Sequence, residues 1–458
     1  MTETTPTTLI ILGASGDLTS RLLLPGLASL LTVEPERRVD VVGVDRGELS
    51  DQEWHTVLVD AMTDSDLSQA RLDELLSTTS YAQADVLDPQ VLADLLRDRS
   101  APVVLYFALP PQVSVKVCAL LEHIDLPPGT QLALEKPFGH DFESAQDLNA
   151  QLLRVVPEEQ IHRVDHFLGV NTVLNLIGIR FANRLLQPVW SAEHIERVDI
   201  TYDENLALEG RASYYDRAGA LVDMVQSHLL QILALFAMEA PASLTSGEVQ
   251  ALKSQVLRAT HLLDDDAVLA SRRARYEAGQ VDGREVPDYV AEQGVDPQRS
   301  TETLAEVILV IDNARWSGVP FRLRSGKALG QKSKRITVTF KAPAHLPTGL
   351  RDTPKPDVLV LDLKPGAVSM VLSMNAEGDP FDLEQKSLTA TLGKPRMLPH
   401  GEVLAGILEG DPLLSIRGDV AEQCWRIMTP VLQAWHDGSV SLDTYPAGTS
   451  GPEHWPAG

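Results

Sequence analysis

Short apolar runs alternate with helix-like segments along the first part of the chain. The runs are rich in aliphatic and β-branched residues and lie at residues 8–13, 39–44, 101–109 and 131–137. Such runs are typical of strands buried in a parallel sheet. Between them, apolar residues recur at helical spacing at residues 18–31, 51–59 and 88–97. Strands that alternate with helices predict a right-handed βαβ succession, and therefore an N-terminal Rossmann-like doubly wound sheet.

The pattern changes after about residue 165. Strands are expected at residues 194–204, 335–342, 357–363 and 367–374, and helices at residues 171–183 and 218–238. Strands that cluster late with little helix between them predict a C-terminal α+β domain with a large, mostly antiparallel sheet. We therefore expect an α/β protein with domains at residues 1–165 and 166–458. The turn-rich tail from Tyr445 onward is expected to be irregular.

Charge and cysteine content exclude several classes of function. The 458 residues include 39 Lys and Arg against 64 Asp and Glu, and the net charge of −25 repels phosphate backbones and anionic lipid. We therefore expect neither a nucleic-acid nor a membrane partner. Cys118 and Cys424 are too few for a disulfide framework or a structural zinc site. The sequence lacks a signal-peptide pattern, and its longest clear apolar run, residues 229–238, is shorter than the ~20 residues of a membrane span, so we expect a cytoplasmic protein.

A glycine-containing turn follows the first expected strand. It comprises Gly13, Ala14, Ser15, Gly16, Asp17 and Leu18. Glycine here lets backbone amides approach a pyrophosphate at the start of a helix, although the pattern is not G-x-G-x-x-G and a plain tight turn explains it equally well. The second strand ends at Asp45 and Arg46. An acid at that place accepts from a free ribose 2′-hydroxyl and an arginine pairs with a 2′-phosphate, so the choice between NAD and NADP stays open, as does a solvated charge pair.

Further candidates for chemistry follow the fourth expected strand. Glu135 and Lys136 come at the carboxyl edge of the predicted sheet, where open α/β sheets bind their ligands. Taken singly, the later candidates have structural explanations. His228 lies on a largely apolar helix and is typical of a core histidine, Asp223 of a capping acid, and Lys327 of a solvated turn residue.

Together the motifs resemble the glucose-6-phosphate dehydrogenase family along nearly the whole chain. They are GASGDL (13–18), YFALPP (106–111), EKPFG (135–139), RVDHFLG (163–169), RFANR (180–184), EGR (209–211), QSHLLQ (226–231), RSGKAL (324–329) and WRIMTP (425–430). The resemblance implies oxidation of C1 of glucose 6-phosphate to 6-phosphogluconolactone, with hydride transfer to NADP, in the first oxidative step of the pentose phosphate pathway. It also implies an NAD(P)-binding first domain, a substrate-binding and dimerisation second domain, and a homodimer or homotetramer.

The resemblance also implies roles for individual residues. A histidine base needs a carboxylate that fixes its tautomer, and these roles fall to His228 and Asp165, with Lys136 as the third catalytic residue. The implied substrate-binding residues are Lys136, His166, Phe167, Val170, Glu204, Asp223, Lys327 and Lys332. The implied cofactor-binding residues are those of the loop from Gly13 to Leu18, extending to Ser20, with Asp45, Arg46, Tyr106 and Lys136. No metal is expected.

The chain departs from the family pattern in the implied phosphate pocket. Where the family commonly reads D-H-Y-L-G-K, this chain has Phe167 and Val170, which removes a hydroxyl donor and a positive charge. One charge-assisted hydrogen bond contributes ~1.5–3 kcal/mol, or roughly 10–150-fold in affinity. Lys364, Arg322 and Lys332 are candidates for compensation. The alternatives are ordinary variation, an NAD(P)-dependent aldose dehydrogenase with a weakened phosphate requirement, and a non-catalytic nucleotide-binding paralogue.

Overall fold

The computed structural model describes residues 6–97, 99, 102–210, 212–351 and 353–455. The chain forms two compact units. Unit 1 comprises Met1–Leu174, Pro241–Leu252 and Lys394–Trp425, and unit 2 comprises Asn175–Ala240, Lys253–Gly393 and Arg426–Gly458. Unit 1 therefore takes its first segment from the start of the chain and two more segments from the second half. The assignment of roles to residues 1–165 and 166–458 stays a prediction.

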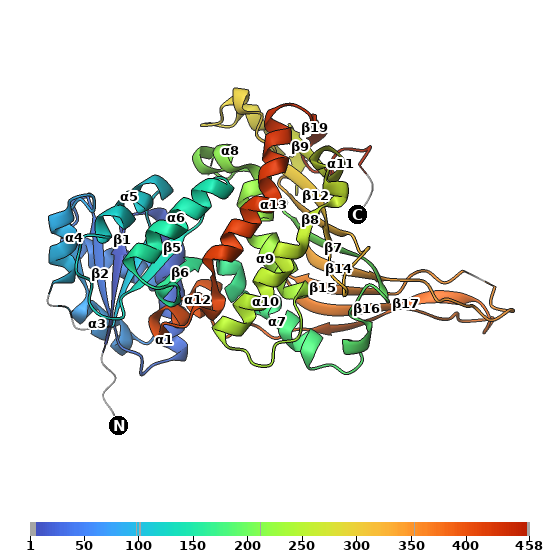
Figure 1. Cartoon of the computed structure of the whole chain (residues 1–458), viewed down its shortest axis with the longest axis horizontal. Helices are drawn as coiled ribbons and strands as arrows, with labels where there is room; N and C mark the ends of the chain where they lie inside the picture. Colours follow the sequence, from blue (N-terminus) through green and yellow to red (C-terminus); the bar gives the residue numbers. More distant parts are fainter. Residues whose placement is uncertain (1–5, 98, 100–101, 211, 352, 456–458) are drawn as a thin grey trace. The chain divides into compact units, whose positions relative to one another are not determined.

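Unit 1 is built on a sheet of seven strands (Figure 1). They are β1 (Thr7–Leu12), β2 (Val39–Asp45), β3 (Ser80–Gln83), β4 (Val103–Phe107), β5 (Gln131–Glu135), β6 (Ile161–Val164) and β18 (Ser415–Ile416). The order is β18-β6-β5-β4-β1-β2-β3, and all neighbours are parallel except β18 with β6. This order confirms the predicted doubly wound sheet and places its topological switch between β1 and β4. β1 is buried along its whole length, as its apolar run predicts.

The helices of unit 1 follow the strands as expected, and one comes from far along the chain. They are α1 (Leu24–Val33), α2 (Asp51–Met62), α3 (Gln69–Thr78), α4 (Pro89–Leu96), α5 (Pro111–Leu121), α6 (Phe142–Val155) and α12 (Pro399–Glu409). Sequence patterns identified α1, α2 and α4 but not α3, α5 or α6. α12 packs against α1 at two glycines, since a Cβ on Gly26 would lie 2.7 Å from the Cβ of His400, and one on Gly401 would lie 2.5 Å from Ser29 Oγ.

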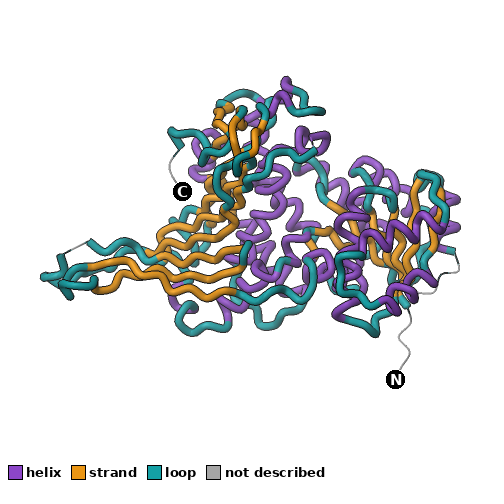
Figure 2. Tube along the Cα trace, turned by 180° about the vertical axis from the view of Figure 1, so that it is seen from behind, coloured by secondary structure: helices purple, strands orange, loops and turns teal. Residues whose placement is uncertain are grey.

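Unit 2 is built on a ten-stranded sheet (Figure 2). Its strands are β7 (Ile195–Asp203), β8 (Thr260–Leu262), β9 (Ser271–Glu277), β12 (Leu304–Ile311), β13 (Phe321–Gly326), β14 (Ser333–Phe340), β15 (Val358–Leu363), β16 (Gly366–Asn375), β17 (Leu383–Thr391) and β19 (Leu442–Pro446). The order is β17-β16-β15-β14-β7-β13-β12-β9-β19, with β8 beside β12. Only the β7–β13 and β9–β19 pairs are parallel, so the predicted mostly antiparallel sheet is confirmed. A separate hairpin pairs β10 (Gly279–Val281) with β11 (Arg284–Val286).

The tail corrects one expectation. Tyr445 and Pro446 are not irregular but complete β19, which adds to β9 as a parallel edge strand. Tyr445 is fully buried, and its hydroxyl donates to the carbonyl of Lys327 at 2.7 Å. The residues after position 455 lie outside the described part of the chain. Burial of one aromatic ring and a strand register therefore outweigh the local turn signals of the sequence.

The buried helix of unit 2 is apolar along most of its length. It comprises α8 (Ala212–Ala220), a π-helix (Leu221–Leu229) and α9 (Leu230–Ala237). Residues Tyr214–Ala237 are long and apolar enough to cross a membrane by length and composition alone, but 89% of the most apolar window is buried. That burial is typical of the core helix of a globular unit. The other α-helices of the described residues are α11 (Ala267–Ala270) in unit 2 and α7 (Asn171–Phe181), α10 (Ser246–Ala259) and α13 (Gly418–His436), each of which has residues in both units.

Candidate active site

The loop after β1 has the geometry of a dinucleotide-binding turn. Gly13 adopts φ +91°, and a Cβ there would overlap the carbonyl oxygen of Ala108, the residue after β4. Its amide donates to Val44 at the end of β2 at 2.8 Å. Only glycine fits this position, at the switch point between β1 and β4 where doubly wound sheets bind their ligands. The chain is helical from Asp17, so the loop also presents a helix N-terminus to an anion.

The two charged residues after β2 differ in their surroundings. The carboxylate of Asp45 accepts hydrogen bonds from Ser15 Oγ at 2.7 Å, from Ser15 N at 3.2 Å and from Arg46 N at 2.7 Å. Asp45 therefore braces the loop against the end of β2. The Arg46 side chain is exposed, and no ion pair to it is found in the part of the chain that the structure describes. The residues present thus fit a dinucleotide with a 2′-phosphate, because Arg46 offers the cation and the loop satisfies the carboxylate of Asp45.

Glu135 and Tyr106 form a partly buried pair next to Lys136. Tyr106 is 1% exposed, and its hydroxyl donates to the carboxylate of Glu135. Burial raises the pKa of Glu135 to about 7, while the hydrogen bond from Tyr106 and the charge of Lys136 act in the opposite direction. Sequence reasoning placed Tyr106 among the cofactor-binding residues; in the structure Tyr106 lies in β4 and its hydroxyl donates to Glu135, and its role towards the cofactor stays a prediction. Lys136 follows β5 at the carboxyl edge of the sheet, as predicted.

Asp165 and His166 follow β6 at the same edge. Asp165 is 1% exposed, and its Oδ1 accepts from the amide of Phe167 at 2.9 Å, which caps a short helix at His166–Gly169. Phe167 is buried and contacts the His166 ring edge-on at 5.0 Å. Val170 ends this short helix and brings no charge to it. The capping hydrogen bond and the ring contact therefore fix the start of this short helix, where Asp165, His166 and Phe167 lie.

His400 lies beside His166 and was missed by sequence reasoning. The two rings are stacked with centroids 5.0 Å apart and planes at 12°. The first turn of α12 reaches this place because Gly169 has no side chain, and a Cβ there would overlap the carbonyl of Pro399. Burial lowers the pKa of His400 to about 4, although the charge of Asp165 acts to raise it. No sequence signal links these histidines, since α12 belongs to a segment that returns to unit 1 from the second half of the chain.

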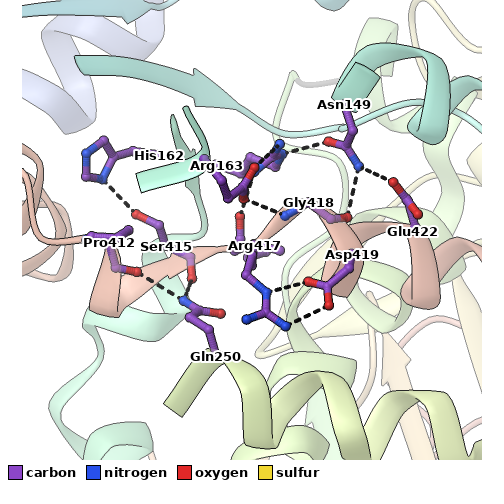
Figure 3. Close-up of polar contacts among 12 residues, drawn as sticks. Asn149, His162, Arg163, Gln250, Pro412, Ser415, Arg417, Gly418, Asp419 and Glu422 are labelled. Carbon is purple, nitrogen blue, oxygen red and sulfur yellow. Dashed lines mark hydrogen bonds and ion pairs between the residues drawn. The ribbon is translucent and has the colours of Figure 1, made fainter. Parts of the chain in front are cut away.

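A buried network fixes the strand that carries Asp165 and His166 (Figure 3). The side chain of Arg163 is fully buried, donates to Asn149 Oδ1 at 3.0 Å and pairs with Glu158 at 2.7 Å. Glu158 also accepts from Gly418 N at 2.8 Å. One residue before Arg163, His162 contacts Ser415 Oγ at 3.0 Å and Gln131 Oε1 at 2.9 Å. The segment 415–418 therefore contacts β6 through His162 and through the Arg163–Glu158 pair, and these contacts hold β6 in place.

Glu204 joins two lysines in unit 2. It follows β7, and its Oε1 accepts from Lys334 Nζ at 2.8 Å while its Oε2 accepts from Lys327 Nζ at 3.0 Å. All three side chains are at most 20% exposed. Burial acts to raise the pKa of Glu204, but the two ammonium groups outweigh it and hold that pKa below its ordinary value. Sequence reasoning identified Glu204 and Lys327, whereas Lys334 was missed; Lys332 is exposed on the same loop.

Asp223 and His228 lie on the π-helix of unit 2. A π-helix bonds residue i to residue i+5, so these two residues stand one turn apart along the same helix. His228 is 1% exposed, and Asp223 is half-buried with Tyr214 Oη 3.4 Å from its Oδ1. Such helices are rare and occur frequently at functional sites. The sequence predicted a helix here but not its widened turn.

The candidate compensating cations differ in availability. Arg322 is committed to Asp199 at 2.7 Å and to Glu306 at 3.5 Å. Lys364 is exposed in the hairpin between β15 and β16, and Lys332 is exposed after β13. Arg322 is therefore already paired with two carboxylates, whereas Lys364 and Lys332 are exposed and no ion pair to either is found among the described residues.

A doubly wound dinucleotide-binding sheet, together with a buried histidine, carboxylates and lysines on loops and a π-helix, defines a nicotinamide-dependent oxidoreductase. The family models described as glucose-6-phosphate dehydrogenase, NAD binding domain, and glucose-6-phosphate dehydrogenase, C-terminal domain, match residues 10–175 and 177–457. The chain belongs to the glucose-6-phosphate dehydrogenase family. The family, the fold class and the oxidoreductase class expected from the sequence are thereby confirmed.

Individual relatives match along nearly their whole length. The glucose-6-phosphate 1-dehydrogenase of Gluconobacter oxydans is 38% identical, with 97% of this chain and 94% of that protein covered. That of Bacillus subtilis is 33% identical, with 97% and 95% covered. A crystal structure of the Mycobacterium avium enzyme has a TM-score of 0.85 at 33% identity, covering 98% and 95% of the two chains. A glucose-6-phosphate dehydrogenase solved in complex with glucose 6-phosphate has a TM-score of 0.87 at 27% identity, covering 98% and 96%. None of these relatives favours the aldose dehydrogenase or the non-catalytic alternative.

Proposed function

We propose that this chain oxidises glucose 6-phosphate at C1 to 6-phosphogluconolactone and delivers the hydride to NADP, the first oxidative step of the pentose phosphate pathway. The observation that carries the proposal is the full-length match to enzymes of that name, one of them bound to glucose 6-phosphate. The site residues support it, since a tight glycine turn follows β1, His228 is buried and Lys327 pairs with Glu204.

The dinucleotide is held by the loop from Gly13 to Leu18 and by Arg46. NADP supplies a nicotinamide ring that accepts hydride when it is bound. The helix N-terminus after Gly16 would hold the pyrophosphate, and the guanidinium of Arg46 would pair with the 2′-phosphate. Because the Asp45 carboxylate is satisfied by Ser15 and by the Arg46 amide, it repels a 2′-phosphate less than a free carboxylate would. NAD is the second cofactor, bound without the Arg46 contact.

Proton removal is assigned to His228. An imidazole nitrogen of His228 accepts the proton of the C1 hydroxyl as hydride leaves C1, and the carboxylate of Asp165 orients the ring and stabilises the imidazolium. The roles of His228, Asp165 and Lys136 rest on the family resemblance. Burial of His228 and the rigid setting of Asp165 support them, because a base fixed in one orientation loses little entropy on reaction.

Substrate binding divides between sugar and phosphate. Lys136, Glu204 and Asp223 bind the sugar hydroxyls, Glu204 and Asp223 as acceptors. His166, Lys327 and Lys332 bind the 6-phosphate. Phe167 and Val170 line the pocket without a polar group.

Initial rates of NADPH and NADH formation with glucose 6-phosphate and with glucose test the proposal directly. We expect the highest kcat/KM for NADP with the phosphorylated sugar. Equal kcat/KM values for the two sugars would indicate the aldose dehydrogenase alternative instead. An absence of turnover with either sugar and either cofactor would indicate the non-catalytic paralogue.

The oligomer is proposed to form through the sheet of unit 2. β16 and β17 extend this sheet as a long hairpin (Figure 1), and exposed apolar side chains lie on or beside them, among them Leu388 at 56% and Phe381 at 55% exposure. Edge strands of this kind pair with another chain unless they are covered. We propose a homodimer or homotetramer in the cytoplasm. Light scattering on a size-exclusion column measures the mass, and a monomer with unchanged activity would contradict the assignment.

A further inference from the structure

We propose that Lys334 determines the specificity of this enzyme for a phosphorylated sugar, because it pairs with Glu204 and leaves Lys327 available to the phosphate dianion. The inference rests on the proposed function, in which Lys327 binds the 6-phosphate. It is carried by contacts among four residues of unit 2: Tyr202, Glu204, Lys327 and Lys334.

The register of the sheet positions Lys334. β14 pairs with β7 in antiparallel register, and Lys334 stands opposite Tyr202, two residues before Glu204. Its Nζ lies 2.9 Å from Tyr202 Oη, 2.8 Å from Glu204 Oε1 and 4.1 Å from the centre of the Tyr202 ring. The side chain is 13% exposed. Lys334 is thus a built-in cation of the site rather than a solvated lysine of the surface.

The charge count shows what Lys334 changes. Lys327 and Glu204 alone form a neutral pair, whereas Glu204 with both lysines carries a net charge of +1. A phosphate dianion approaching Lys327 would otherwise have to displace a carboxylate that has no other partner of opposite charge in this cluster. A partly buried carboxylate without a partner of opposite charge is unfavourable in free energy. Lys334 avoids this penalty because Glu204 stays paired with it when Lys327 turns to the phosphate. Lys327 can then exchange Glu204 for the ligand.

The same arrangement explains how the family pattern can be broken at Val170. The chain lacks the lysine expected there, and Arg322, one candidate replacement, is committed to Asp199 and Glu306. Lys334 supplies one positive charge in a defined place.

The test compares three variants of the full-length enzyme. Lys334→Met keeps the length of the side chain and removes its charge, Lys334→Arg keeps the charge, and Arg335→Met is the matched control. Arg335 is the next residue of β14, is 44% exposed and pairs with Asp362 at 3.5 Å. Neighbouring residues of a strand point to opposite faces, so the control removes one cation from the same strand but not from the cluster.

The measured quantities are KM for glucose 6-phosphate, kcat/KM for glucose, the inhibition constant of inorganic phosphate and KM for NADP. We expect Lys334→Met to raise the KM for glucose 6-phosphate and the inhibition constant of phosphate roughly 10–100-fold, the effect of one charge-assisted contact. The values for glucose and NADP should change less than about threefold, well below the effect of one such contact. Lys334→Arg should restore most of the phosphate preference, and Arg335→Met should resemble the wild type.

Each other result overturns the inference. An unchanged preference in Lys334→Met, or an equal loss in Arg335→Met, shows that Lys334 has no specific role. Parallel losses for both sugars and for NADP show a role in stability only, and circular dichroism with NADP binding identifies that case. A wild type that does not discriminate between glucose 6-phosphate and glucose contradicts the proposed function itself, which is a different failure from an insensitive Lys334 variant.

Discussion

The role of a single side chain in this enzyme depends on the contacts that its neighbours make with it. Asp45 and Arg46 are adjacent in sequence, yet the carboxylate braces the loop through Ser15 and the guanidinium is exposed. Glu204 accepts hydrogen bonds from two lysines, while the hydroxyl of Tyr106 donates to the carboxylate of Glu135. Residue identity therefore sets what a side chain can do, and the contacts of its neighbourhood decide which of these roles it has.

Replacement of His228 tests the assigned base. His228→Asn should lower kcat by ~10²–10⁴-fold, the range for loss of a general base, with little change in KM. His261→Asn serves as the control, because His261 is also a histidine of unit 2 but is partly exposed and paired with Asp265. Stopped-flow or steady-state rates measure the effect. Turnover within a few-fold of the wild type in a folded His228→Asn enzyme would remove the base assignment.

Replacement of the residues after β2 tests cofactor recognition. Arg46→Ala should lower kcat/KM for NADP by roughly 10-fold or more and leave that for NAD nearly unchanged, since one charge-assisted phosphate contact is lost. Asp45→Ala should instead weaken both cofactors, because it removes the acceptor for Ser15 Oγ and for two backbone amides. Steady-state constants for both dinucleotides measure these effects. A selective gain for NADP in Asp45→Ala would show that its charge, not its bracing of the loop, is what matters.

At the scale of elements, short segments position the reactive groups. The π-helix at Leu221–Leu229 begins where Gly219 turns the chain with φ 64° and ψ 178°, a conformation open essentially only to glycine. Buried Glu302 then accepts from the amide of Leu221 at 2.9 Å and fixes the start of the helix. β6 is fixed in a similar way by the network around Arg163. Each element is rigid because its ends, not only its apolar face, are bonded.

Replacement of Gly219 tests this view of the helix start. Gly219→Ala should destabilise unit 2 by about 2–4 kcal/mol, because an added Cβ is strained at this φ and overlaps the carboxylate of Glu302. Gly318→Ala is the matched control, with φ +84° and nothing within 4 Å of its Cβ, and it should cost only about 1 kcal/mol. Urea unfolding followed by circular dichroism gives both values. Equal losses in the two variants would show that conformational strain alone accounts for the effect.

At the scale of the whole molecule, burial of titratable groups makes stability depend on pH. Burial lowers the pKa of both His162 and His400 to about 4, and both lie in unit 1. A histidine with a depressed pKa binds a proton in the unfolded chain before it does so in the folded one. Its contribution to stability is therefore present above the unfolded pKa of about 6.5 and is lost as pH falls towards 4.

The pH dependence can be isolated with one variant. The free energy of opening at β6, measured by hydrogen exchange of its amides, should fall between about pH 7 and pH 4 more steeply in the wild type than in His162→Asn. Between pH 7 and pH 4, the free energy of opening should fall by roughly 3 kcal/mol more in the wild type than in His162→Asn, the value expected for a histidine pKa lowered from 6.5 to about 4. Partly buried Glu135, whose pKa is raised to about 7, acts in the opposite sense in both proteins and cancels in the comparison. Parallel pH profiles would show that His162 does not titrate differently on unfolding.

Local patterns determined much of this protein. The strands at 8–13, 39–44 and 131–137, the helices after the first two of them and the motifs around Gly13, Lys136, Asp165 and His228 can be read from the sequence, because strand period, helix period and turn chemistry act over a few neighbouring residues. The same motifs were sufficient to identify the family. The motifs identified candidate residues, but they did not indicate which side chains lie beside each candidate.

Tertiary structure decided the neighbours. His400 stacks on His166 only because α12 returns to unit 1, and Lys334 reaches Glu204 only because of the register between β14 and β7. The first two residues of the tail, Tyr445 and Pro446, complete β19 because β9 offers an open edge, against the local turn signals. In each case the contact joins segments distant in the chain, and its geometry is set by packing and strand pairing. No short stretch of sequence encodes such geometry, since the energy that selects it belongs to both segments together.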